Sequence, residues 1–152
     1  MRLAIALARE NVARQTGGPF GSVVRASSGE VAAMGVNLVE PSGNPLLHAE
    51  VAALSLAGAA RSAGATLFST CEPCIMCLGA AHWAQVGRIV SAALREDAEG
   101  VGFAEGDGCA ELKAEMASRG VVIETAFMRA DAAEILRAYR DGGGPIYGPS
   151  SR

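Results

Sequence analysis

The sequence predicts a single α/β domain built on a mixed β-sheet, and three observations support this prediction. The chain has 152 residues, which is the length of one domain. Half of its residues are hydrophobic and 19% are charged, a composition typical of a chain that buries its own core. A helix and a hairpin are followed by strands that alternate with helices, and this order favours a layered α/β arrangement.

Each element follows from a local pattern. Leu3, Leu7 and Val12 recur between charged residues, which is typical of an amphipathic helix, and the turn sequence at 27–30 joins two apolar stretches into a hairpin. Pro73 stands where a helix begins. The expected elements are helix 3–15, strands 20–25 and 31–36, a loop over 39–45, helix 48–63, strand 65–70, helix 74–84, strand 88–93, a loop with a helical turn over 96–109, helix 109–118, strand 121–124 and helix 131–140. The domain should therefore span residues 1–140, followed by a Gly/Pro-rich carboxyl-terminal arm over 141–152.

Charge and hydropathy exclude several classes of function. The chain carries 13 basic and 16 acidic residues, a net charge of −3, and the basic residues are scattered, which disfavours binding to a nucleic acid backbone. The apolar run at the amino terminus ends at Arg9 and Glu10 without a cleavage site, so we expect no export signal. No uncharged apolar stretch is long enough to span a membrane, and we expect a cytoplasmic protein.

Three of the four cysteines, Cys71, Cys74 and Cys77, lie within seven residues of one another, whereas Cys109 is distant. This crowding does not suit an ordinary disulfide framework. It indicates metal or redox chemistry in a reducing compartment.

Two short motifs carry the candidate chemistry, His48-Ala49-Glu50 and Pro73-Cys74-Ile75-Met76-Cys77. His48, Cys74 and Cys77 can supply three of the four positions around a zinc ion and leave the fourth for water. Both sets of ligands stand at predicted helix starts, where free amides favour a thiolate. Glu50 is the candidate group for proton transfer, because zinc acidifies water and a nearby carboxylate can accept the proton.

Other interpretations of these motifs remain. An isolated C-x-x-C can be half of a structural zinc site or a redox pair. Cys71 could complete a four-ligand structural site, but it precedes Pro73, outside the helix start, and we interpret it as a core residue. Cys109 is likewise assigned to the core, and His82 to packing.

The combination of H-x-E with P-C-x-x-C resembles the zinc-dependent cytidine-deaminase-like superfamily. The stretch Ser69–Ala80, the following Trp83-Ala84, the triplet Pro19-Phe20-Gly21 and Gly102-Phe103 make the chain most similar to bacterial guanine deaminases, over residues 19–105. The resemblance implies a three-layer α/β/α fold with a mixed five-stranded sheet. It also implies a homodimer in which residues 131–147 lie near the partner's pocket.

The resemblance further implies roles for single residues. Asn37 would hydrogen-bond the base, the Ala49 backbone amide would contact it, and Phe20 would pack near the ring. Glu105 would be a second acidic catalytic residue. The expected substrate-binding residues are Phe20, Asn37, Ala49, Trp83 and Tyr147.

The sequence departs from the family pattern at several positions. Leu46-Leu47 replaces a frequent Thr-Ala, and His82 replaces a frequent Tyr. Some members close the pocket with an aromatic residue near the carboxyl terminus, and Tyr147 is the candidate here.

The expected activity is zinc-dependent hydrolysis of a free nucleobase, guanine to xanthine plus ammonia. One alternative is a tRNA adenosine deaminase, although residues 95–100 are acidic and would repel a tRNA backbone. A cytosine or triazine aminohydrolase is another alternative. A structural zinc module that binds a partner is the non-enzymatic one, and it would leave Glu50 without a purpose.

Overall fold

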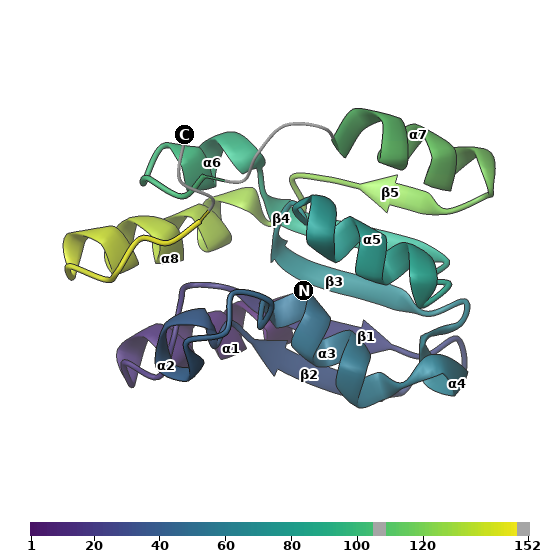
Figure 1. Cartoon of the computed structure of the whole chain (residues 1–152), viewed down its shortest axis with the longest axis horizontal. Helices are drawn as coiled ribbons and strands as arrows, with labels where there is room; N and C mark the ends of the chain where they lie inside the picture. Colours follow the sequence, from purple (N-terminus) through teal and green to yellow (C-terminus); the bar gives the residue numbers. More distant parts are fainter. Residues whose placement is uncertain (105–108, 149–152) are drawn as a thin grey trace.

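The computed structural model describes residues 1–104 and 109–148. In chain order, its elements are α1 (Arg2–Ala13), β1 (Gly21–Arg25), β2 (Val31–Val36), α2 (Val39–Ser42), α3 (Ala49–Ala57), α4 (Ala59–Ser62), β3 (Thr66–Cys71), α5 (Ile75–Trp83), β4 (Arg88–Ala93), α6 (Arg95–Glu99), α7 (Cys109–Ser118), β5 (Val122–Glu124) and α8 (Arg129–Asp141) (Figure 1).

The strands form one mixed sheet in the order β2-β1-β3-β4-β5, which confirms the predicted five-stranded sheet. β1 is antiparallel to both β2 and β3, whereas β3, β4 and β5 are parallel. Cys71 at the end of β3 pairs with Ala93 at the end of β4. The carboxyl ends of these two strands therefore lie side by side, and the segments that follow them share one edge of the sheet.

Helices cover both faces of the sheet. α3 packs on β1 and β2 and contacts α5, which contacts α7, whereas α1 packs on β1 and contacts α8. Gly21 faces α1, whereas Gly35 faces α3. Gly35 pairs with Ser22, the residue after Gly21, and successive residues of a strand face opposite sides of the sheet, so the two helix layers lie on opposite faces. The predicted α/β/α layering is confirmed. Within the two described ranges, no helix is both long and apolar enough to cross a bilayer.

Gly35 allows α3 to lie directly on the sheet. A Cβ atom at this position would lie 2.2 Å from the carbonyl oxygen of Ala49 and 2.6 Å from the amide nitrogen of Ala53. Both are backbone atoms of α3, so they cannot move aside as a flexible side chain could. Only glycine permits this approach. The first turn of α3 is therefore held against β2.

Two predicted elements differ from the structure. Residues 39–42 form the short helix α2 where a loop was expected, because the Ser42 hydroxyl donates to the Leu38 carbonyl and Gly43 ends the turn in a left-handed conformation with a φ of 64°. The predicted helix 48–63 divides into α3 and α4. Gly58 ends α3 with a φ of 70°, a conformation that glycine adopts without strain.

Candidate active site

The starts of two helices meet beside the carboxyl end of β3. His48 is the residue immediately before α3, and Cys74 is the residue immediately before α5. Cys77 lies one helical turn after Cys74, so the two sulfur atoms project from the same end of α5. The contact between α3 and α5 brings the imidazole to these sulfurs.

The geometry of these three side chains fits a zinc ion. His48 Nδ1 lies 3.6 Å from the Sγ atoms of both Cys74 and Cys77, and the three atoms lie within 4.8 Å of one another. Zinc bonds of about 2.1 Å to nitrogen and about 2.3 Å to sulfur, at a tetrahedral angle, separate the two donor atoms by about 3.6 Å. Three protein ligands leave one position open, as in catalytic zinc sites.

Cys71 does not join this group. Its Sγ atom lies 3.6 Å from the Leu94 carbonyl oxygen at the end of β4, and its side chain is buried in the core that includes Ala93. Among the described residues, the candidate metal cluster consists of His48, Cys74 and Cys77. The placement of Cys71 agrees with its interpretation as a core residue.

The Glu50 carboxylate lies against the cluster and is buried, with 6% of the residue exposed. Its Oε1 accepts a hydrogen bond of 2.7 Å from the Ser69 hydroxyl, and its Oε2 lies 3.4 Å from Cys77 Sγ. Ser69 belongs to β3, beneath the first turn of α3. The carboxylate is therefore fixed between the sheet and the cysteines.

The surroundings shift the pKa values of Glu50 and Cys74 in opposite directions. Burial raises the pKa of Glu50, the Cys74 sulfur raises it further, and the Ser69 hydrogen bond opposes the rise. The hydrogen bond from Cys77 and, against the effect of burial, the neighbouring His48 lower the pKa of Cys74 to about 4. A thiolate is the form in which cysteine binds metal, and a carboxyl group with a raised pKa is suited to accept and return a proton.

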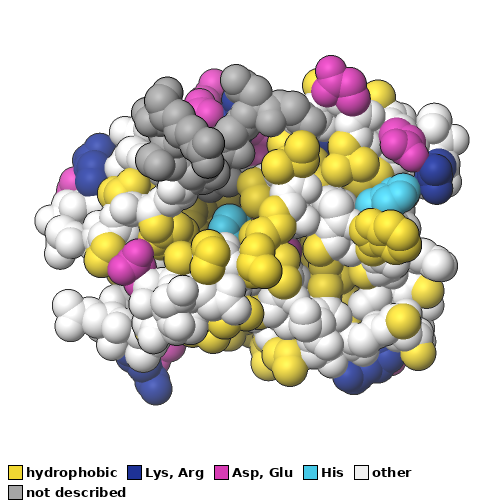
Figure 2. Space-filling model, in the orientation of Figure 1, with side chains coloured by type: hydrophobic (Ala, Val, Ile, Leu, Met, Phe, Trp, Pro, Cys, Tyr) yellow, Lys and Arg dark blue, Asp and Glu magenta, His cyan; other side chains and the backbone are white. Residues whose placement is uncertain are grey.

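A pocket of about 460 Å³ opens beside the cluster. His48, Cys74 and the ring of Tyr147 line it, and Figure 2 shows apolar side chains gathered over this part of the α3–α5 face. The apolar lining residues are Val39, Pro45, Leu46, Ile75, Met76 and Ala104. Such a wall suits a flat, uncharged ring.

A narrow recess leads from the cluster to Phe20, Asn37 and Glu50. Asn37 is 1% exposed, and its backbone carbonyl accepts a 2.9 Å hydrogen bond from the side chain of Asn11. The same Asn11 amide donates to the Gly18 carbonyl at 2.8 Å. Asn11 thus ties the two loops that carry Phe20 and Asn37.

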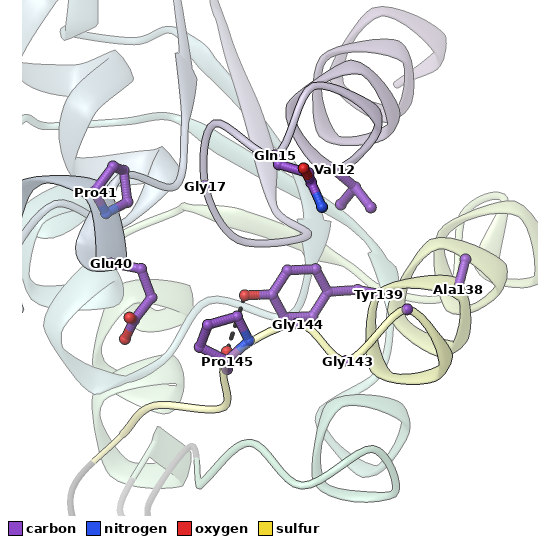
Figure 3. Close-up of a pocket in the computed structure, with 11 residues that line it drawn as sticks. Val12, Gln15, Gly17, Glu40, Pro41, Ala138, Tyr139, Gly143, Gly144 and Pro145 are labelled. Atoms are coloured by element: carbon purple, nitrogen blue, oxygen red, sulfur yellow. Dashed lines mark hydrogen bonds between the residues drawn. The ribbon is translucent and has the colours of Figure 1, made fainter.

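The carboxyl-terminal segment folds back over its own domain. The Tyr139 hydroxyl donates a 2.9 Å hydrogen bond to the Pro145 carbonyl, at the edge of a second pocket of about 440 Å³ (Figure 3). The ring of Tyr147 then meets that of Phe103 edge to face, with 5.1 Å between centroids, and Phe103 meets Phe20 at 5.0 Å. An aromatic wall therefore runs from the carboxyl-terminal segment to the recess.

The structure brings together most, but not all, of the predicted site residues. Ala49, the first residue of α3, is fully buried next to His48. Trp83 is elsewhere: it ends α5, is 86% exposed and lines a different surface hollow with His82. At the helical rise per residue, it lies about 13 Å along the axis from Cys74 and about 9 Å from Cys77. Glu105 lies outside the described residues.

Sequence reasoning missed Ser69, Asn11 and Glu72, which hold the functional side chains in place. Ser69 is a polar residue in an otherwise buried strand, and Asn11 is a polar residue on the buried side of an amphipathic helix. Each is a signal that a hydrogen-bond partner is required. Glu72 lies between Cys71 and Cys74, and its local sequence does not indicate its contact with Lys113, which is 41 residues away.

Comparisons with known proteins agree with this site. The family model of the cytidine and deoxycytidylate deaminase zinc-binding region matches residues 1–93. The guanine deaminase of Bacillus subtilis is 41% identical over 107 residues, which are 68% of this chain and 68% of that protein. A solved structure of guanine deaminase from Nitrosomonas europaea has a TM-score of 0.84 and 34% identity, and the match covers 92% of this chain and 82% of that one.

Two other relatives have names that indicate enzymes acting on tRNA. The tRNA-specific adenosine deaminase of Streptococcus pyogenes is 32% identical over 126 residues, 80% of this chain and 70% of that protein. The tRNA(Ile)-lysidine synthase of Deinococcus radiodurans is 36% identical over 138 residues, 88% of this chain but 23% of that protein. With its family model, its fold and its His/Cys/Cys cluster in agreement, the chain belongs to the cytidine and deoxycytidylate deaminase family and is a zinc-dependent aminohydrolase.

Proposed function

We propose that this protein hydrolyses free guanine to xanthine and ammonia. The observation that carries the proposal is the buried Glu50 carboxylate, which lies against the His48, Cys74 and Cys77 cluster at the inner end of an apolar pocket. The guanine deaminases among the relatives and solved structures support guanine as the base.

In this proposal, His48 Nδ1 and the sulfurs of Cys74 and Cys77 hold the zinc. A bound zinc ion supplies Lewis acidity, which makes water a nucleophile near neutral pH. Glu50 takes a proton from the attacking water and delivers protons to a ring nitrogen and to the departing amino group. The Ser69 hydroxyl holds Oε1, and Oε2 lies on the side of the metal ligands, next to Cys77 Sγ.

The recess would orient the base. Asn37 and the backbone amide of Ala49 hydrogen-bond its edge, and the rings of Phe20 and Tyr147 contact its faces. Glu105 would accept hydrogen bonds from the N1–H and 2-amino groups of guanine. Adenine offers a single amino group, which is the reacting one, so the Glu105 carboxylate would have no hydrogen-bond donor from the base.

The tRNA alternative is less favourable for this surface. Glu96 and Asp97 of α6 are acidic, although Arg129 pairs with both. The chain carries a net charge of −3, and a polynucleotide gains affinity mainly from cations. A cytosine or triazine substrate remains an alternative because its reacting amidine group is chemically similar to that of guanine. A structural zinc module would not need the buried, hydrogen-bonded Glu50.

The assembly and location belong to the same proposal. We take residues 1–140 as the deaminase domain and 141–152 as its arm, in a homodimer that binds a small molecule and no nucleic acid. Exposed apolar side chains on the α3–α5 side, including Leu46, Leu56 and Ile75, are available for a partner. The four cysteines are thiols that form no disulfide with one another, which suits the reducing cytoplasm.

The first prediction concerns the ligand set. Cys71→Ala should retain about one zinc per chain, because its sulfur faces Leu94, whereas Cys74→Ala should lose most of the metal. Metal content after gel filtration, measured by atomic absorption, tests this. Loss of zinc from the Cys71→Ala protein would indicate a four-ligand structural site instead.

The second prediction concerns Glu50. Glu50→Gln and Glu50→Ala should bind zinc and fold but lose about 10²–10⁴-fold in kcat, because proton transfer has lost its carrier. Turnover and metal content are measured on the same preparations, and the Gln variant controls for the cavity left by Ala. Activity near that of the wild type would refute the mechanism.

The third prediction concerns the substrate. Ammonia release from guanine should exceed release from adenine by orders of magnitude, and Glu105→Gln should weaken guanine turnover more than zinc binding. The panel comprises guanine, cytosine, adenine, guanosine and ammeline, with inosine formation in tRNA as a separate assay. Faster turnover of adenine, or of adenosine in tRNA, would contradict the assignment to guanine.

The fourth prediction concerns assembly. Light scattering of the zinc-loaded protein at micromolar concentration should give about twice the 15.5 kDa chain mass. Leu56 is 67% exposed in the single chain. Leu56→Glu should shift the protein towards monomer, because a dimer interface would bury the new charge without a partner. A fully active monomeric wild type would refute the dimer.

A further inference from the structure

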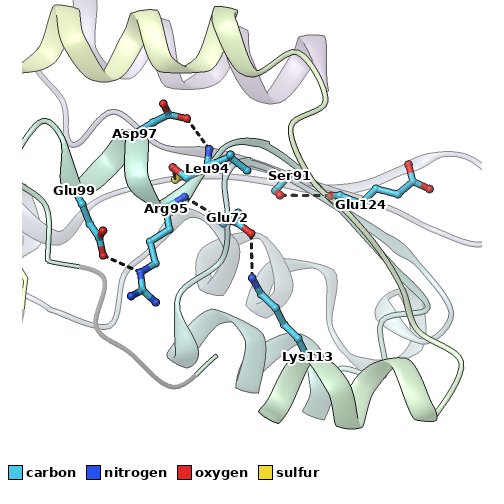
Figure 4. A network of polar contacts seen from close by, with 9 residues as sticks. Glu72, Ser91, Leu94, Arg95, Asp97, Glu99, Lys113 and Glu124 are labelled. Carbon is cyan, nitrogen blue, oxygen red and sulfur yellow. Dashed lines mark hydrogen bonds and ion pairs between the residues drawn. The ribbon is translucent and has the colours of Figure 1, made fainter. Parts of the chain in front are cut away.

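Glu72 lies in the short segment that joins β3 to the cysteine-bearing helix α5. Its backbone N–H donates a 2.9 Å hydrogen bond to the Ala93 carbonyl, which extends the pairing of β3 with β4. Its two carboxylate oxygens have separate partners, the Arg95 backbone and the Lys113 side chain (Figure 4). It is two residues before Cys74, so its position sets where α5 begins.

One oxygen of Glu72 caps another helix. Oε2 accepts a 3.0 Å hydrogen bond from the backbone N–H of Arg95, the first residue of α6. The residue before that helix, Leu94, has no polar side-chain atom with which to cap it. Asp97 accepts a hydrogen bond from the Leu94 backbone N–H, and Glu72 accepts one from the Arg95 backbone N–H. α6 has five residues, too few to be stable without such partners.

The helix α6 leads directly into the pocket wall. Four residues after its end, Phe103 meets both Phe20 and Tyr147, and Ala104 lines the pocket. The Glu72 carboxylate therefore connects the metal-ligand segment with the opposite wall of the pocket.

The other oxygen of Glu72 is neutralised from a third helix. Oε1 accepts a 3.0 Å hydrogen bond from Lys113 Nζ in α7, the single lysine of the chain. The Glu72 side chain is 17% exposed and that of Lys113 31%, whereas the Arg88–Glu124 pair at the sheet edge is 45% and 43% exposed. Ion pairs as exposed as Arg88–Glu124 contribute little to stability, but a carboxylate that is largely shielded from solvent and hydrogen-bonded to two helices, α6 and α7, contributes more.

We propose that Glu72, held by Lys113, is a positioning residue that fixes the Cys74 segment relative to the Phe103–Ala104 wall. It touches neither the metal nor the base and acts through the backbone of α5 and α6. The proposal rests on the proposed ligand set, and its effect on KM also rests on the proposed substrate.

The test uses the zinc-loaded full chain and measures zinc transfer to a colorimetric chelator, well below the melting temperature of every variant. Glu72→Ala should release zinc about tenfold faster than the wild type and raise the KM for guanine more than it lowers kcat. Glu72→Gln keeps an acceptor for Arg95 but loses the charge, so it should show a smaller increase in release rate. Lys113→Met should match Glu72→Gln.

The double variant Glu72→Gln/Lys113→Met should be no worse than either single variant, because both remove the same interaction. Glu124→Ala, which breaks the more exposed Arg88–Glu124 ion pair and alters no residue that lines the pocket or the recess, is the control and should leave zinc release unchanged. If Glu72→Ala does not fold, the Gln and Met variants decide. Release within about twofold of the wild-type rate in both the Gln and the Met variant, or effects that multiply in the double variant, would overturn the proposal.

A wild type that holds zinc but deaminates no base would refute the proposed function while the zinc-release test still stands.

Discussion

The direct approach of α3 to the sheet at Gly35 is the constraint on which the rest of the site depends. It fixes the helix start that carries His48 and Glu50, so these side chains reach the cysteines at the start of α5. A carboxylate buried at this point loses its hydration and needs partners from the protein. Ser69, on the strand beneath, provides one. The positions of the catalytic side chains therefore depend on how closely the α3 backbone packs against the sheet.

Much of the fold follows from local signals in the sequence. Hydrophobic periodicity placed all five strands to within one residue, because each strand is an apolar run bounded by turn residues. The errors fell where backbone conformation outweighed composition: the Ala-rich run 48–63 looks continuous, but Gly58 adopts a positive φ. The short helix at 39–42 depends on Ser42 and Gly43, in a segment whose Pro and Gly content indicated a loop.

The metal cluster could be predicted because its spacing is local, with an H-x-E and a C-x-x-C each at a helix start. The supporting residues could not, since they are defined by contacts between distant segments. Asn11 and Asn37 are 26 residues apart, and Glu72 and Lys113 are 41 apart. Trp83 shows the converse difficulty: the motif continues to it, but the axis of α5 carries it away from the pocket.

The family model ends at residue 93, which divides the site in two. His48, Glu50 and the cysteines lie within the matched region, whereas Phe103, Ala104 and Tyr147 lie beyond it. The metal ligands and Glu50 are therefore encoded in the part that the family model matches, whereas part of the pocket wall is encoded in the residues that follow.

The spacing of the ligands also affects folding. His48 and Cys77 are 29 residues apart, and α3, α4 and β3 lie between them. Nothing in an unfolded chain would hold these atoms 3.6 Å apart, so metal binds the native state in preference and stabilises it by mass action, by about 4 kcal/mol at a thousandfold excess over Kd. A bound zinc ion would then cross-link the start of α3, through His48, to the start of α5, through Cys74 and Cys77. The thermal stability of this enzyme therefore depends on the free zinc concentration, and zinc deprivation would reduce the amount of folded protein as well as its turnover.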